Sequence, residues 1–285
     1  MLGLSINHYL TPEGYSLTRF LDEAAAVGAE GVGMTERALS EMALPELKRA
    51  LRERNLVVTS LNSSGFFLWA DPERAARQAE INARLIARAA ELEADTLVLI
   101  GGGLHDMGEE HPRNLAEARR RVEAELPAII EAAGRAGVRL GIEPMHPLRI
   151  FTKACLNTLA QTEVLLQRHP DLGLVLDLFH SWWEPDLHEA LGRLADRITL
   201  VQVCGVTQSR TEPALPRRCL PGEGVIDLPA ILKTLDQAGY RGRFEFELFA
   251  QDLDGREPVD VMRAAMADFA WLAGDANAEQ GRPVA

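Results

Sequence analysis

The sequence has few cysteines, no surplus of positive charge and no long apolar run. Cys155, Cys204 and Cys219 are an odd, sparse set without metal-binding spacing, which excludes a disulfide framework and fits a reducing compartment. The 285 residues carry 30 Lys and Arg against 42 Asp and Glu, a net charge of −12, so we expect no basic face for nucleic acid. No apolar run approaches the roughly 18 residues of a membrane span, and MLGLSINHYL shows no signal-peptide pattern. We therefore expect a cytoplasmic protein that binds neither nucleic acid nor membrane.

Several motifs of other enzyme classes are also missing. The first turn lacks GxGxxG, and neither a GxxxxGK[ST] phosphate loop nor a GxSxG or Ser-His-Asp arrangement occurs. Hydrophobic residues make up 47% and charged residues 25%, ordinary values for a globular protein that exclude a disordered chain. The length of 285 residues allows two ordinary domains or one (β/α)8 barrel, which typically has about 250 residues.

Short apolar runs alternate with longer segments of helical periodicity about eight times. The runs are Leu2–Ile6, Gly31–Met34, Leu56–Leu61, Thr96–Ile100, Val138–Ile142, Leu172–Leu176, Ile198–Val203 and Arg243–Leu248. The clearest helical segments are Arg19–Val27, Pro72–Leu92, Asn114–Ala133, Pro229–Ala238 and Val259–Leu272. This alternation predicts a parallel sheet, and eight units favour a single (β/α)8 TIM barrel over residues 1–273, with residues 274–285 as a loose tail. A long polar loop over residues 207–224 is expected to cover a site.

Polar residues follow or end the last four predicted strands. Glu143 and Asp177 directly follow strands five and six, and Gln202 lies near the end of strand seven. The last strand carries Glu245 and Glu247 on one side. Side chains alternate along a strand, so these polar groups should face the barrel axis at the end where such barrels hold their active sites. Buried carboxylates are costly without a compensating charge, and an all-oxygen set suits Mg²⁺ or Mn²⁺.

The same segments resemble the sugar phosphate isomerase/epimerase superfamily, the xylose isomerase-like TIM barrels. The matching motifs are Gly-Ile-Glu143-Pro-Met-His-Pro, Asp177-Leu-Phe-His180-Ser-Trp-Trp-Glu-Pro-Asp-Leu, Leu-Pro-Gly-Glu-Gly-Val-Ile-Asp-Leu-Pro at 220–229 and Gly-Tyr-Arg-Gly-Arg-Phe-Glu-Phe-Glu247. They cover the second half of the chain closely, whereas the first half matches mainly in its strand–helix rhythm. The motifs are specific for the superfamily but not for one substrate.

The resemblance implies one divalent metal held by Glu143, Asp177, Gln202 and Glu247. It also implies that Glu143 and Glu247 exchange protons with a substrate carbon and that His180 binds a substrate oxygen. Two departures stand out, since most relatives have histidine in place of Gln202 and often aspartate in place of Gly205. An amide oxygen binds a hard cation but should hold zinc less well, so we favour Mn²⁺ or Mg²⁺, with Co²⁺ or Zn²⁺ as alternatives.

Further substrate contacts are expected from the loops at the same end of the barrel. His8 and His105 follow strands one and four, and Trp182 could form an apolar wall. An arginine could pair with a phosphate or carboxylate through its planar fork, and a surface role is the alternative for each. The candidates are Arg149, Arg217 and Arg218.

These expectations combine into a metal-dependent isomerase or epimerase of a sugar, sugar phosphate or related small hydroxy-carbonyl compound. The cation would acidify a C–H bond next to a carbonyl, and two glutamates would move the proton through a metal-stabilised enediolate. A dehydratase or lyase of a polyol-derived ketone could use the same site, and a non-catalytic sugar-binding relative is the alternative from another class. Net charge argues against the endonuclease members of this fold. Exposed barrel helices would allow a homodimer or homotetramer.

Overall fold

The computed structural model describes residues 3–108, 114–212 and 215–274, and it confirms the expected fold class. Eight parallel strands form one closed barrel in the neighbour order β1, β10, β7, β6, β5, β4, β3, β2. These strands are β1 (Leu4–Asn7), β2 (Gly31–Thr35), β3 (Val57–Gly65), β4 (Leu97–Ile100), β5 (Leu140–Ile142), β6 (Leu172–Asp177), β7 (Ile198–Val203) and β10 (Arg243–Phe246). Residues 275–285 of the expected tail lie outside the described residues.

Helices follow the strands, and side-chain caps explain where several of them begin. The α-helices are α1 (Leu17–Ala26), α2 (Glu36–Glu41), α3 (Leu44–Glu53), α4 (Pro72–Leu92), α5 (Leu115–Arg135), α6 (Leu159–Arg168), α7 (Leu178–Ser181), α8 (Leu187–Leu194), α9 (Leu228–Gln237) and α10 (Pro258–Leu272). Asp71 accepts a hydrogen bond from the Arg74 N–H at 2.9 Å, which caps α4 before its first proline. Asn114 and Thr158 cap α5 and α6 in the same way.

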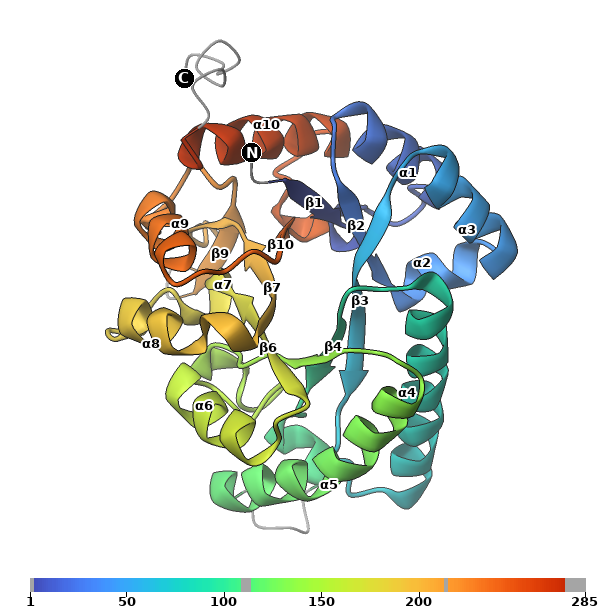
Figure 1. The fold of residues 1–285 in the computed structure, drawn as a ribbon, viewed down its shortest axis with the longest axis vertical. Coiled ribbons are helices and arrows are strands. Elements are labelled where there is room, and N and C mark those ends of the chain that lie inside the picture. The colour runs from blue at the N-terminus through green and yellow to red at the C-terminus, as the bar shows by residue number, and fades with distance from the viewer. Residues whose placement is uncertain (1–2, 109–113, 213–214, 275–285) are drawn as a thin grey trace. The chain divides into compact units, whose positions relative to one another are not determined.

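The chain divides into two compact units, and each is described by itself. The first unit comprises Met1–Thr59 and Val201–Ala285. Within it β1 pairs in parallel with β10 and with β2, and α10 contacts both β1 and α1 (Figure 1). The rings of Phe244 on β10 and Phe269 on α10 have centroids 5.4 Å apart. The apolar side of β10 therefore meets a helix, as the alternation of Phe and Glu predicts.

The second unit, Ser60–Leu200, contains the parallel pairs β3–β4, β4–β5 and β5–β6. Helices α4 and α5 contact each other and lie side by side in Figure 1. Val98, Ile100, Ala154, Val175 and Leu200 form a buried apolar cluster, with Phe66 and Met145 packed against it. The cluster includes Val175 on β6 and has Met145 packed against it, two residues before Asp177 and two residues after Glu143.

The predicted loop over residues 207–224 contains regular structure that the polar composition did not indicate. β8 (Gly205–Gln208) and β9 (Pro216–Cys219) form an antiparallel pair in register from Gly205–Cys219 to Gln208–Pro216. The pairing satisfies backbone groups that an irregular loop would expose. The segment is thus a hairpin followed by the Leu-Pro-Gly-Glu-Gly turn.

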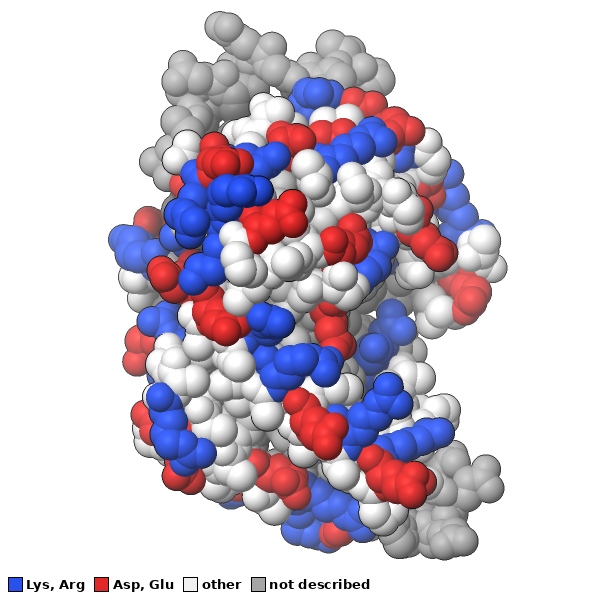
Figure 2. Space-filling model, turned by 90° about the vertical axis from the view of Figure 1, so that its right-hand side faces the viewer, with Lys and Arg blue, Asp and Glu red and all other residues white. Residues whose placement is uncertain are grey.

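Charged side chains of both signs are interspersed on the face of the molecule shown in Figure 2. Elsewhere among the described residues oppositely charged side chains pair as well, such as Arg193 on α8 with Glu163 on α6 at 3.0 Å. Among the described residues, no helix is both long and apolar enough to cross a membrane.

Candidate active site

Glu143, Asp177 and His180 come together in the second unit as a buried cluster. One ligand atom from each lies within 4.8 Å of those of the others. His180 Nε2 is 3.6 Å from Glu143 Oε1 and also 3.6 Å from Asp177 Oδ2. The three residues are 5%, 1% and 5% exposed. Two carboxylates and an imidazole nitrogen at this spacing are suitable ligands for a divalent cation.

Local sequence explains how these three side chains are placed. β5 ends at Ile142, and Pro144 follows Glu143, so the strand stops where the carboxylate begins. Asp177 ends β6 and caps the short helix α7, because its Oδ1 accepts a hydrogen bond from the Phe179 N–H at 2.8 Å. His180 lies on α7, so the single turn after the aspartate brings the ring back toward the strand ends.

Aromatic side chains lie beside this cluster in the same unit. The Trp183 Nε1–H donates to the His180 carbonyl at 2.8 Å, and the Trp183 ring meets His146 edge-on at 5.5 Å between centroids. Trp182 is half-buried, and its buried Nε1 has no hydrogen-bond partner among the described residues. Trp182 therefore offers an unused N–H donor in addition to the apolar wall that the sequence predicts.

Gln202, Glu245 and Glu247 come together in the first unit. The Gln202 Nε2 donates to Glu245 Oε1 at 3.1 Å and to Glu247 Oε1 at 3.2 Å. All three side chains are buried, and their contacts bring together Gln202 on β7, Glu245 on β10 and Glu247 just after β10. The Gln202 Oε1 is buried without a hydrogen-bond partner within the described part of the chain. A buried amide oxygen in that state fits a ligand of a hard cation.

Arg218 on β9 forms a buried ion pair with Glu247. Its Nη2 lies 2.8 Å from Glu247 Oε2, and the two side chains are 3% and 6% exposed. The guanidinium carbon also lies 5.2 Å from the centre of the Phe249 ring. The hairpin thus places a fixed positive charge against the carboxylate that the sequence predicts to be catalytic.

Among the remaining predicted substrate contacts, His8 makes hydrogen bonds within the protein through both of its ring nitrogens. His8 is fully buried, with Nδ1 2.9 Å from Thr35 Oγ1 and Nε2 3.2 Å from Thr11 Oγ1. Burial, helped by the nearby Arg37, lowers the pKa of His8 to about 3, so its ring is neutral at pH 7. Both ring nitrogens are occupied, so a role for His8 in orienting β1 and β2 accounts for its contacts.

Arg217 on β9 faces a different partner from Arg218. Its Nη1 lies 2.9 Å from both carboxylate oxygens of Asp254, and its Nη2 donates to the Asp252 carbonyl at 3.0 Å. The Asp254 hydrogen bond raises the pKa of Arg217 above its ordinary value.

The two other predicted substrate contacts are exposed. Arg149 lies at the end of a short 3₁₀ turn after Glu143. His105 is exposed in the turn after β4, with its ring 5.7 Å from that of Phe151.

Two structural contributions were not apparent from the sequence. Asn157 donates through Nδ2 to the carbonyls of Met145 and Ala154, at 2.9 and 3.1 Å, and so ties down the loop after Glu143. At Gly205 a Cβ atom would lie 2.1 Å from the Glu223 carbonyl, so the close approach of the Pro-Gly-Glu-Gly turn explains the absence of a side chain. The motif 220–224 signalled that a turn exists but not what it packs against.

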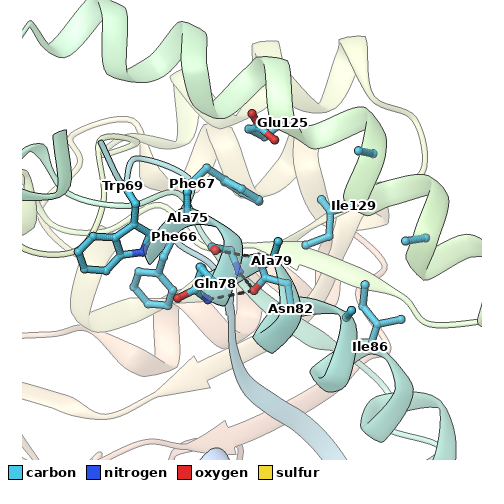
Figure 3. A pocket seen from close by; sticks show the side chains of 14 residues that line it. Phe66, Phe67, Trp69, Ala75, Gln78, Ala79, Asn82, Ile86, Glu125 and Ile129 are labelled. Atoms are coloured by element: carbon cyan, nitrogen blue, oxygen red, sulfur yellow. Dashed lines mark hydrogen bonds between the residues drawn. The ribbon is translucent and has the colours of Figure 1, made fainter. Parts of the chain in front are cut away.

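A separate apolar pocket of about 290 Å³ lies in the second unit between α4, α5 and the segment after β3. Figure 3 shows Phe66, Phe67 and Trp69 along one side of it, with Asn82 reaching Gln78 and the backbone of Gly65. None of the predicted catalytic or metal-binding residues lines this pocket.

The chain is similar to known proteins in both sequence and structure. The family model described as xylose isomerase-like TIM barrel matches residues 21–273. A crystal structure of a Sinorhizobium meliloti 1021 protein is 31% identical, with a TM-score of 0.86 over 95% of this chain and 98% of that one.

Two curated relatives match over shorter stretches. L-ribulose-5-phosphate 3-epimerase of Escherichia coli O17:K52:H18 is 31% identical over 137 residues, 47% of this chain and 45% of that protein. 3-Dehydroshikimate dehydratase of Pseudomonas putida KT2440 is 31% identical over 125 residues, 42% of this chain and 19% of that protein. The matched segments thus span less than half the length of either relative.

Proposed function

The chain belongs to the xylose isomerase-like TIM barrel family, and from this premise we propose that it is a divalent-metal-dependent isomerase or epimerase of a sugar, sugar phosphate or related small hydroxy-carbonyl compound. The buried cluster of Glu143, Asp177 and His180 carries the proposal, because burying two carboxylates beside one imidazole is costly unless a cation compensates them. The match to a ribulose-phosphate epimerase supports the substrate class.

We propose that Glu143, Asp177, Gln202 and Glu247 hold one divalent ion. The set contributes only oxygen atoms, which favours Mn²⁺ or Mg²⁺ over Zn²⁺ and Co²⁺. When bound, the ion supplies Lewis-acid polarisation of a carbonyl oxygen, which makes the neighbouring C–H bond more acidic. His180 Nε2 is close enough to Glu143 and Asp177 to bind a substrate oxygen beside this ion.

Glu143 and Glu247 are proposed to move the proton, one removing it from carbon and the other returning it. Arg218 and Gln202 hold the Glu247 carboxylate through its Oε2 and Oε1 atoms, so its orientation is set before substrate binds. Trp182 would present its unused Nε1–H and its ring face to the substrate. Contacts from His8, His105, Arg149, Arg217 and Arg218 to substrate stay predictions.

A dehydratase is the second candidate, because one curated relative is a 3-dehydroshikimate dehydratase. Proton removal beside a carbonyl is common to both reactions, and a dehydratase then expels a hydroxyl group where an isomerase returns the proton. We also propose a cytoplasmic location and assembly as a homodimer or homotetramer.

Solvent deuterium incorporation tests the proposed chemistry. Mn²⁺-loaded protein is incubated in D₂O with a panel of ketoses, ketose phosphates and a dehydroshikimate-like ketone, and exchange at carbon is followed by proton NMR. Glu247→Gln and Glu143→Gln should each lose about 10²–10⁴-fold in exchange rate on the substrate found, because a general acid or base is removed. Glu125→Gln, an exposed carboxylate on α5, is the matched control. Full exchange by the Glu247→Gln protein would refute the proton-transfer role.

A further inference from the structure

The orientation of the Gln202 carboxamide is determined by its neighbours. Its Nε2 donates to Glu245 Oε1 at 3.1 Å and to Glu247 Oε1 at 3.2 Å, and an amide oxygen in its place would face two further acceptor oxygens. The NH₂ group must therefore face the two glutamates, and the Oε1 atom must point away from them. That oxygen is the buried atom without a hydrogen-bond partner in the described part of the chain.

Glu245 is itself held rigidly as the acceptor. The Tyr9 N–H donates to Asn7 Oδ1 at 3.0 Å, so the Asn7 NH₂ group faces Glu245 and donates to its Oε1 at 2.8 Å. The Thr59 hydroxyl donates to the other oxygen, Oε2, at 2.6 Å. Glu245 has no exposed surface, and its surroundings are tight, because a Cβ atom at Gly33 would lie 2.6 Å from Oε2.

We propose that Glu245 is a positioning residue, which orients the Gln202 carboxamide so that Oε1 and not the amide nitrogen meets a bound cation. This inference rests on the proposed metal-dependent function. The two ends of a carboxamide have nearly the same shape but opposite hydrogen-bonding character, so an amide ligand needs a partner that distinguishes them. Glu247 alone is a weaker guide, since its Oε2 is occupied by Arg218 and the carboxylate is itself a proposed ligand.

Metal affinity of the full-length protein tests this role without relying on turnover. EDTA-treated wild-type protein and variants are titrated with Mn²⁺ in a calorimeter. Glu245→Leu should bind Mn²⁺ about 10–100-fold more weakly, the range typical of removing a group that orients a metal ligand. Glu245→Gln should stay within about threefold of wild type, because its amide oxygen still accepts from Gln202 and its NH₂ can face the Thr59 hydroxyl.

A double-variant cycle separates positioning from a general structural effect. If Glu245 acts through Gln202, adding Glu245→Leu to Gln202→Ala should weaken Mn²⁺ binding by less than about threefold beyond Gln202→Ala alone. Losses that multiply, or a Glu245→Leu protein that binds Mn²⁺ as tightly as wild type, would overturn the inference while leaving the metal-dependent function standing. A wild-type protein that binds no Mn²⁺ would overturn both.

A measurement on the wild-type protein covers the case in which Glu245→Leu does not fold. Protein labelled with ¹³C and ¹⁵N in glutamine is titrated with Mg²⁺, and the Gln202 signals are identified by their loss in Gln202→Ala. The Gln202 Cδ resonance should shift as the oxygen binds the ion, while the NH₂ protons stay protected from solvent exchange by the two glutamates. Rapid exchange of those protons, or an unchanged Cδ in protein that binds Mg²⁺, would overturn the inference.

Discussion

At the scale of single residues, Arg218 and Glu247 form a buried ion pair in the first unit. Both side chains are almost fully buried, so the attraction between the two charges compensates for the water that each has lost. Glu245 on β10 and Glu247 just after this strand both accept from the Gln202 amide, but their other partners differ. Asn7 and Thr59 make Glu245 a fixed acceptor, and Arg218 gives Glu247 a charged partner. Identical residue types thus acquire different proposed roles from their surroundings.

Removing the guanidinium should be costly because it leaves Glu247 buried beside a second carboxylate. We expect Arg218→Met to lower the free energy of unfolding by about 3–5 kcal/mol, as for other buried pairs that lose one partner. Arg263→Met is the matched control, because Arg263 pairs with Asp260 at 2.8 Å while both side chains are about two-thirds exposed, at 65% and 63%. Its effect should stay below about 1 kcal/mol. Urea unfolding measures both, and equal losses would argue against the buried pair.

At the scale of elements, the start of α6 depends on a carboxylate from a distant loop. Both oxygens of Glu184 lie 3.0 Å from the Leu159 N–H, at the first turn of that helix. Burial, together with the nearby Asp186, raises the pKa of Glu184 to about 7 from its ordinary 4.5. The folded chain therefore holds a proton at this site in a pH range where the unfolded chain has released it.

This shift gives α6 a pH-dependent contribution to stability. Between pH 4.5 and 7 the folded state binds more protons at Glu184 than the unfolded state, so the stabilisation present at low pH is lost as the pH rises through 7. Glu184→Gln keeps an acceptor for the Leu159 N–H without a charge. Relative to wild type, this variant should gain roughly 1–3 kcal/mol between pH 5 and pH 8 in urea unfolding. A difference that is the same at both pH values would contradict the assignment.

At the scale of the whole molecule, a bound cation should act as a stabilising ligand. The unfolded chain has no preformed ligand set, so metal that binds the folded state raises its stability by mass action. We expect about 2.7 kcal/mol at a free Mn²⁺ concentration of 100 times the dissociation constant, relative to EDTA-treated protein. Asp177→Asn should remove most of this increment. Thermal or urea unfolding with and without Mn²⁺ checks it, and an equal increment in Asp177→Asn would exclude Asp177 as a ligand.

The sequence predicts the longest helices of the barrel but misses several shorter elements. The long helix α4 has a cap, a proline at its first position and many turns of regular spacing, and it begins and ends at the predicted residues. The helices α2 and α8 span only six and eight residues, over which periodicity is a weak signal. The helices α3 and α6 were also missed, although they are as long as the predicted helices α1 and α9. The β8–β9 hairpin was missed because its strands are polar and pair only with each other.

The sequence by itself determined the barrel and the polar positions at its strand ends. Strand and helix alternation repeats along the chain, and side-chain parity follows from a period of two, so both can be read locally. Tertiary structure alone decided which polar groups meet. His180 joins Glu143 across 37 positions of sequence, Gln202 meets Glu245 across 43, and Arg218 meets Glu247 across 29. These pairings depend on how strands and the hairpin pack in three dimensions, and no local pattern of residues encodes them.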